Sequence, residues 1–238
     1  MKKLAALAAV AVVALWVAPA HAAVVSHYAM TETSGTVMHD DVDSHNGVIG
    51  PLVRLTGATG YDFPGWQNNV QNGRLFGTVP AAGSIVTVQD PTRVFDGDNV
   101  SVRLKARLVN GHLPTQAVGG SVPSYNVVQK GKAKSQGGFW KMEVTNAGKL
   151  RCTAANPSTT KAVVSTPVVA DGNEHLVACN LAGGKLTVTV DGVSKSVNTT
   201  IAPHPTGKFA YVSIGKKPGS TDPSDAFSGN LRDLTFSG

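Results

Sequence analysis

Two stretches decide the fold of this chain: FWKMEVTNAGKL at residues 139–150 and GGKLTVTVDG at residues 183–192. In each of them apolar and polar residues alternate; Trp140 and Met142, for example, are separated by a lysine and followed by a glutamate. A period of two places neighbouring side chains on opposite faces of a β-strand. The Asp-Gly pair that ends the second stretch is typical of a tight hairpin turn. Both stretches therefore predict antiparallel strands with one apolar face.

The same alternation continues outside these stretches. Residues 100–108 repeat it, with Val102 on the apolar face and Arg103 and Lys105 on the polar face. The whole segment from Phe139 to Thr199 is predicted to form one antiparallel meander. Because strands with one apolar face need a second layer to cover that face, we predict a single all-β sandwich domain.

The chain begins with the pattern of an export signal. A basic start and an apolar run, together residues 1–17, precede small residues at positions 20–22, which suit cleavage by a signal peptidase. A membrane-spanning helix needs about 20 consecutive apolar residues, and no other stretch approaches that length. We therefore expect a signal peptide at residues 1–22, one secreted domain at residues 23–238, and no membrane anchor.

The composition limits the possible classes of protein. Of the 238 residues, 42% are hydrophobic and 15% are charged, which argues against a disordered chain or a coiled coil. The formal net charge of +6 is spread along the chain without a block of lysine and arginine, so no nucleic-acid partner is expected. The sequence leaves the oligomeric state open.

The two cysteines, Cys152 and Cys179, both fall on the apolar face of an alternating run. Their spacing fits neither a zinc site nor a thioredoxin-like motif. In an oxidising compartment we expect them to form a disulfide in the core, which would stabilise the fold by about 3.5 kcal/mol on the chain-entropy estimate. The alternative is a pair of buried free thiols.

Four motifs occur in the order found in bacterial laminin-G-like domains, and the chain resembles that family from residue 24 to its end. They lie at residues 32–47 (ETSGT, then HNG), 127–142 (VVQKG, then GFWKM), 171–193 (DGNEHLVA, then VDGV) and 213–234 (SIG, then FSGNLRDL). The resemblance implies a concanavalin A-like jelly roll, a sandwich of two curved antiparallel sheets. Lectins, glycan-binding modules, adhesion domains and some glycanases share this fold, so the fold alone does not choose among those uses.

The sequence offers little catalytic machinery. Glycanases of this superfamily need two carboxylates across the scissile bond. The glutamates Glu32, Glu143 and Glu174 have no acidic residue two positions later, and no nucleophile-elbow, metalloprotease or phosphate-loop motif is present. We therefore predict a non-catalytic module that binds a carbohydrate or another extracellular polymer. The alternatives are a polysaccharide hydrolase or lyase with a non-standard catalytic set, and a purely structural or adhesion domain.

The predicted ligand-binding face is basic. Arg103, Lys105 and Arg107 alternate along one strand. They are expected to meet Lys141 and Glu143 on the same sheet face, with the lysines and arginines as donors to an acidic or hydroxyl-rich glycan. Aromatic residues that could stack on a sugar are Trp66, Tyr61, Tyr125 and Phe139. The alternative is that the basic residues form the solvated face of an amphipathic sheet.

A structural calcium ion is the predicted cofactor. Asp40, Asp41 and Asp43 crowd one loop, where their charges repel unless a cation neutralises them. Calcium prefers carboxylate and carbonyl oxygens, which such a loop supplies. By resemblance, an ion that ties the N-terminal loop to the last strand would be held by Asp40 and Asp233, with Asp43 beside them. The alternative is a solvated acidic turn.

Overall fold

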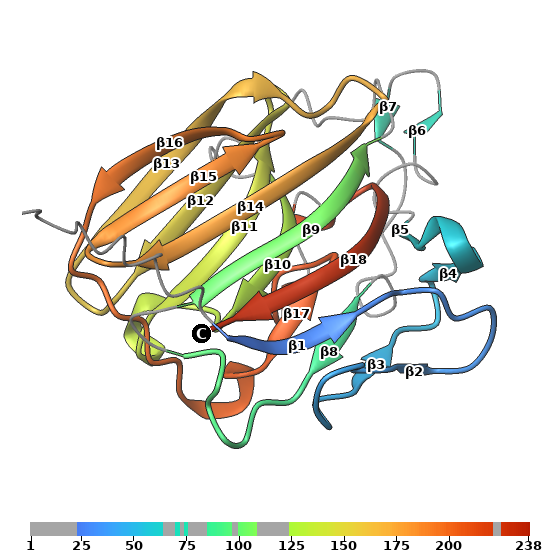
Figure 1. Ribbon diagram of the computed structural model, residues 1–238, viewed down its shortest axis with the longest axis horizontal. Helices are drawn as coiled ribbons and strands as arrows, with labels where there is room; N and C mark the ends of the chain where they lie inside the picture. Colours follow the sequence, from blue (N-terminus) through green and yellow to red (C-terminus); the bar gives the residue numbers. More distant parts are fainter. Residues whose placement is uncertain are drawn as a thin grey trace, which may run out of the picture.

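The structure is a computed structural model that describes residues 23–63, 70–71, 74–75, 85–96, 100–108, 124–220 and 225–238 (Figure 1). The predicted signal peptide at residues 1–22 lies outside the described residues. Within these ranges the regular elements are β-strands and the short 3₁₀ turns η1 (Gly57–Thr59), η3 (Lys134–Gln136) and η4 (Gly207–Phe209). No helix in them is long and apolar enough to cross a membrane. The predicted all-β fold is confirmed.

One antiparallel sheet, which we call sheet A, contains both ends of the domain. Its strands, in spatial order, are β16 (Val193–Asn198), β15 (Lys185–Val190), β14 (Glu174–Ala182), β9 (Val100–Leu108), β18 (Gly229–Ser237), β5 (Tyr61–Phe63) and β4 (Arg54–Leu55). The first strand, β1 (Val24–Tyr28), pairs with the last strand, β18. This pairing ties the start of the domain to its end.

The second antiparallel sheet, sheet B, packs face to face against sheet A, and Figure 1 views one over the other. Its strands, in spatial order, are β13 (Thr160–Val168), β12 (Lys149–Ala155), β11 (Phe139–Thr145), β10 (Ser124–Lys130), β17 (Val212–Ile214), β8 (Val86–Val88), β3 (Gly47–Ile49) and β2 (Val37–Met38). A separate small hairpin joins β6 (Val70–Gln71) to β7 (Arg74–Leu75). The predicted strands around residues 100–108, 140–145 and 185–190 are confirmed as β9, β11 and β15.

The predicted single meander from Phe139 to Thr199 is wrong in one respect. The chain forms two meanders, β11–β12–β13 in sheet B and β14–β15–β16 in sheet A. The connection between β13 and β14 crosses from one sheet to the other, so β12 and β13 lie against β15 and β16. The two meanders can therefore bury their apolar faces against each other.

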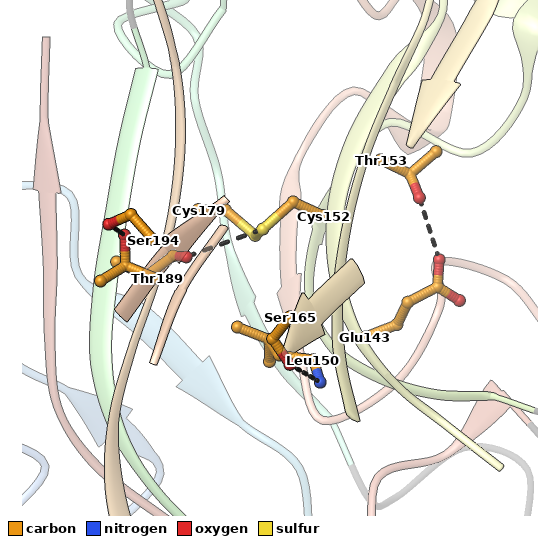
Figure 2. Close-up of a disulfide and its surroundings, with 9 residues drawn as sticks. Glu143, Leu150, Cys152, Thr153, Ser165, Cys179, Thr189 and Ser194 are labelled. Atoms are coloured by element: carbon orange, nitrogen blue, oxygen red, sulfur yellow. Dashed lines mark hydrogen bonds between the residues drawn. A yellow bond between two sulfur atoms is a disulfide. The ribbon is translucent and has the colours of Figure 1, made fainter. Parts of the chain in front are cut away.

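The predicted disulfide between Cys152 and Cys179 is confirmed and joins the two sheets. Cys152 lies on β12 and Cys179 on β14, with 5.6 Å between their Cα atoms. Figure 2 shows this bond between the sheets. Thr153 points away from it on one side, and Thr189 and Ser194 lie on the other. The bond thus marks the core side of each strand.

Aromatic side chains fill the centre of the sandwich. Phe236 of β18 is fully buried, with its ring centroid 4.7 Å from that of Phe95 and 6.1 Å from that of Trp140. The Trp140 indole donates a hydrogen bond of 2.9 Å to the Phe95 carbonyl, which satisfies its buried polar group. The prediction that Trp140 faces the core is confirmed.

The core also contains a lysine. The Lys130 side chain, at the end of β10, is 1% exposed, and its Nζ lies 2.5 Å from the Asp90 carboxylate and 2.9 Å from that of Asp96. Lys130 also donates to the carbonyl oxygen of Ala210, and Arg93 pairs with Asp96 from outside. Two cations thus balance two carboxylates. The cluster anchors the loop before β9 to the core, since a buried charge is tolerated only where it is paired and hydrogen-bonded.

A histidine links two turns at one end of sheet A. The His175 ring contacts Asp191 in the hairpin turn after β15 at 2.7 Å and Asp171 in the turn before β14 at 2.9 Å. Burial lowers the pKa of His175, but the hydrogen bonds to Asp191 and Asp171 more than offset this and raise it above its usual value of 6.5. His175 therefore joins the turn before β14 to the turn after β15.

We expect this cluster to make stability depend on pH. The pKa of His175 is higher in the folded state than in the unfolded state. Its contribution to the free energy of unfolding is therefore complete below the unfolded pKa of about 6.5 and is lost as pH rises through the folded-state pKa. The melting temperature of a His175→Gln variant should therefore fall furthest below that of the wild type near pH 5, and the gap should narrow by pH 9. His204→Gln is the control, because its ring makes no hydrogen bond among the described residues. A gap that widens toward pH 9 would contradict this account.

Candidate functional site

The candidate site is the outer face of sheet B, which points away from the core. The strand register places Ser213, Gln129, Lys141 and Thr153 in one row across β17, β10, β11 and β12. A second row contains Asn126, Glu143 and Arg151. Polar residues therefore occupy neighbouring positions on four strands, although the sequence had singled out only Lys141 and Glu143 among them.

Glu143 is the centre of this polar network. Its carboxylate lies 2.8 Å from Lys141 Nζ and 2.7 Å from the Arg151 guanidinium. It also accepts hydrogen bonds from the hydroxyls of Ser124 and Thr153. Figure 2 shows Glu143 and Thr153 on the side of sheet B that faces away from the disulfide. The Glu143 side chain is 1% exposed, so an ionised carboxylate is buried on a face outside the core.

The basic neighbours keep this carboxylate charged. Burial alone would raise the pKa of Glu143, but the Lys141 ammonium and the Arg151 guanidinium outweigh it and lower the pKa to about 2. At neutral pH the group is an anion that fixes two cations. It holds no proton that it could donate to a leaving group.

The ends of the two cations remain accessible to a ligand. The side chains of Lys141 and Arg151 are 21% and 28% exposed. Lys141 Nζ also lies 5.7 Å from the ring centroid of the half-buried Phe139, two residues earlier on the same face. A fixed ammonium, a guanidinium and an aromatic ring on one face can donate charge-assisted hydrogen bonds to a sugar and stack on it.

A second layer of amides supports this row. Asn126 donates to the side-chain oxygen of Gln129 at 2.6 Å, and Gln129 donates to the carbonyl of Gly131 at 2.6 Å. Both side chains are buried. Their hydrogen bonds lie within β10 and the residue that follows it, so they brace this strand and are not themselves available to a ligand.

The prediction that Arg103, Lys105 and Arg107 share a face with Lys141 is wrong. The first three lie on β9 in sheet A, whereas Lys141 lies on β11 in sheet B, and the polar faces of these strands point to opposite sides of the sandwich. Lys105 pairs with Asp233 at 3.1 Å. Arg103 is exposed and forms no ion pair within the described part of the chain, and the side chain of Arg107 lies outside the described residues.

Of the predicted stacking aromatics that the structure describes, only Phe139 lies at this site. Tyr61 and Tyr125 are buried in the core. Trp66 lies outside the described residues. Phe139 is therefore the aromatic residue that the structure brings next to Lys141.

The aspartates predicted to hold calcium contact basic groups instead. Asp233 accepts from the His27 ring at 2.9 Å through one oxygen and lies 3.1 Å from Lys105 Nζ through the other. The hydrogen bond from His27 is the main reason that the pKa of Asp233 is lowered. Asp40 accepts from the backbone N–H of His27 at 3.0 Å, so His27 connects the N-terminal loop to the last strand.

Asp40 and Asp43 converge on a second histidine. The His45 ring nitrogen lies 3.5 Å from Asp43 and 3.8 Å from Asp40, whose second oxygen is buried without a hydrogen-bond partner. Asp233, the third predicted ligand, already faces two basic groups, Lys105 and His27. The described side chains contain no group of three metal-ligating residues. Calcium binding stays a prediction.

The sequence did not show that Glu143 is the centre of a network, because its partners other than Lys141 come from other strands. Arg151 stands directly across from Glu143 on β12, and Ser124 belongs to β10. Two features of the sequence pointed to this role. Glu143 lies two positions after Lys141 on the polar face of one strand, and the next strand carries Arg151.

Three solved structures share the fold at low sequence identity. The sialidase of Trypanosoma rangeli in complex with sialic acid matches with a TM-score of 0.59 and 11% identity, over 90% of this chain and 30% of the sialidase. The binding domain of botulinum neurotoxin serotype D matches with a TM-score of 0.57 and 12% identity, over 90% of this chain and 48% of that one. The chain thus spans less than half the length of either protein.

The third match covers nearly the full length of both chains. Domain 4 of an extracellular arabinanase from Geobacillus stearothermophilus, in complex with arabinotriose, has a TM-score of 0.56 and 14% identity, over 91% of this chain and 92% of that domain. A search of curated proteins finds no match. The sequence family described as the concanavalin A-like lectin/glucanases superfamily, of laminin-G type, matches residues 115–238, just over half of the chain. The protein therefore belongs to the concanavalin A-like lectin/glucanase superfamily as a laminin-G-like domain.

Proposed function

We propose that the chain is a secreted, non-catalytic module that binds a carbohydrate or another extracellular polymer on the outer face of sheet B. The observation that carries this proposal is the buried Glu143 carboxylate, which fixes Lys141 and Arg151 on that face. A buried ion pair contributes little net stability to a fold, because desolvation of the two charges can cost as much free energy as their attraction gains. A network of this kind outside the core is better explained as a pre-organised set of donors.

The neighbours with the same fold support a binding role. The arabinanase domain, which corresponds to this chain over nearly its whole length, is in complex with arabinotriose, and the neurotoxin match is a binding domain. The disulfide between Cys152 and Cys179 suits an oxidising compartment, which supports secretion.

The chemistry of the site favours binding over hydrolysis. Glycosidases use a pair of carboxylates, one of which donates a proton to the leaving group. Glu143 is the only acidic residue in the described strands of sheet B, and its pKa of about 2 keeps it ionised. A hydrolase on this face would need a second carboxylate that these strands do not supply.

A substitution at Lys141 tests the site. Lys141→Met removes the ammonium and keeps an apolar side chain of similar length. Because a hydrogen bond to a charged group is worth about 1.5–3 kcal/mol, we expect about tenfold weaker binding or more to any polysaccharide that the wild type retains. The measurement is affinity electrophoresis in gels that contain each polysaccharide of a panel.

Lys105→Met is the matched control, since Lys105 is also a partly exposed lysine paired with a carboxylate, but on the outer face of sheet A. Its affinity should stay within about twofold of the wild type. Weaker binding by Lys105→Met together with unchanged binding by Lys141→Met would move the site to sheet A.

A further inference from the structure

Four loops, three of them taken together with flanking strand residues, lie at one end of the sandwich. These segments are residues 131–138, 156–161, 182–185 and 198–211. Hydrogen bonds join them: His204 N–H donates to the Gly137 carbonyl at 3.0 Å, and Thr199 N–H donates to that of Gly184 at 2.9 Å. Lys134 Nζ lies 3.3 Å from the carbonyl of Ser158. We call this surface the loop end.

The loop end carries charge of one sign. Its four loops contain no aspartate or glutamate and five lysines, namely Lys132, Lys134, Lys161, Lys185 and Lys208. None of these lysines forms an ion pair with a carboxylate within the described part of the chain. The opposite end of sheet A differs, because Asp171 and Asp191 lie there and pair with His175. Adjacent unpaired cations raise the local potential and attract anions.

A hollow lies beside Lys161, one of these lysines. It has a volume of about 340 Å³ and is lined by Asn156, Thr159, Lys161, Gly184, Asn198, Thr199, Thr200 and Ile201. A second hollow of about 350 Å³ lies beside the same segment, against residues 181–184. Both volumes fall in the range of about 300–1,000 Å³ typical of small-molecule sites. Amides, hydroxyls and an ammonium are donors suited to a hydroxyl-rich ligand.

The loop end also presents an aromatic platform. The half-buried ring of Phe209 has Lys132 Nζ 4.3 Å from its centroid and Lys208 Nζ 5.0 Å from it. The ring of Tyr211 lies 6.4 Å away, centroid to centroid. Cation–π contacts of this kind hold the ammonium groups near the ring, where they can meet a ligand that stacks on it.

We propose that the loop end binds an anionic polysaccharide, with its lysines contacting carboxylate or sulfate groups and its hollow accepting a sugar unit. This inference rests on the proposed function of polymer binding and adds the class of polymer and a second surface that holds it. The five lysines supply the charge, and the amides and hydroxyls supply hydrogen bonds to the sugar.

The test compares polymers that differ only in charge. The probes are polygalacturonate and its methyl-esterified form, and dextran sulfate and dextran, with the whole secreted domain at several salt concentrations. We expect binding at least about tenfold tighter to a charged polymer than to its neutral counterpart, and a steep loss of affinity with added salt. A preference for polygalacturonate or for dextran sulfate identifies the anionic group.

Paired substitutions locate the site. The variant K161S/K208S should bind the preferred anionic polymer about fivefold more weakly or worse and show a shallower salt dependence. The control R103S/K195S has the same net charge but changes exposed basic residues of sheet A outside the loop end, and it should stay within about twofold of the wild type.

Each failure has a distinct result. Equal weakening by both pairs would overturn the inference, because net charge alone would then explain binding, and so would equal affinity for charged and neutral polymers. Binding to vesicles that contain phosphatidylserine without binding to either anionic polysaccharide would overturn it as well.

Absence of binding to every polysaccharide would remove the proposed function too. Binding that Lys141→Met weakens and K161S/K208S does not would leave the proposed function in place without this inference.

Discussion

Replacement of Lys130 by Met should lower the free energy of unfolding by about 3–5 kcal/mol, the usual cost of breaking a buried ion pair by removing one partner. Because Met fits the space of the Lys130 side chain, the loss of stability comes from the missing charge. Asp90 and Asp96 would remain buried with Arg93 as their remaining cation. Urea unfolding followed by tryptophan fluorescence measures the effect, because Trp140 contacts the carbonyl of this loop through its indole.

Two further variants separate charge from packing. The double variant K130M/D90N should recover part of the loss, since it removes one of the unpaired carboxylates. Lys185→Met, which changes an exposed lysine, should alter stability by no more than about 0.5 kcal/mol. A loss below about 1 kcal/mol for Lys130→Met would show that the cluster contributes little to the fold.

Removal of the disulfide should have an effect of similar size. The bond closes a loop with a sequence separation of 27 residues and links sheet A to sheet B. The chain-entropy estimate for such a loop is about 3.5 kcal/mol, and loss of a native disulfide typically costs about 2–5 kcal/mol. The variant C152S/C179S should therefore unfold at a lower urea concentration than the oxidised wild type.

Chemical reduction is the matched comparison, because it breaks the same bond without changing the sequence. Reduced wild-type protein and the double serine variant should show nearly the same midpoint. A mass of the native, unreduced protein that corresponds to two free thiols would contradict the disulfide, as would a midpoint that reduction does not change.

The positions of the strands could be predicted from the sequence. Alternation in residues 100–108, 140–145 and 185–190 predicts β9, β11 and β15, because a half-buried strand must repeat its apolar side chains every second position. The same rule placed Cys152 and Cys179 on core faces, and their bond confirms it.

The sheet to which each strand belongs could not be predicted from the sequence. A period of two says which face of a strand is buried, but both sheets of a sandwich bury one face, so β9 and β11 show the same pattern. For this reason the predicted meeting of Lys105 with Lys141 was wrong. The pairing between strands depends on long-range packing, which no local pattern contains.

The same limit applies to the site. Glu143 gains its partners across strands, and Asp233 meets His27 and Lys105 from β1 and β9. The sequence showed a crowded set of aspartates that needed neutralising charge. It did not show that a histidine and a lysine from distant strands reach Asp233.

We propose that the domain holds an extracellular polysaccharide without cleaving it, and a single experiment measures both retention and cleavage. Purified protein is incubated with a panel of insoluble polysaccharides, and the bound protein and the soluble products are both quantified. We expect retention on at least one polysaccharide, a reduced retention for Lys141→Met, and no release of reducing ends or unsaturated sugars. Oligosaccharides that appear in proportion to protein and time, and that persist after repurification, would contradict the account and assign the domain to the enzymes.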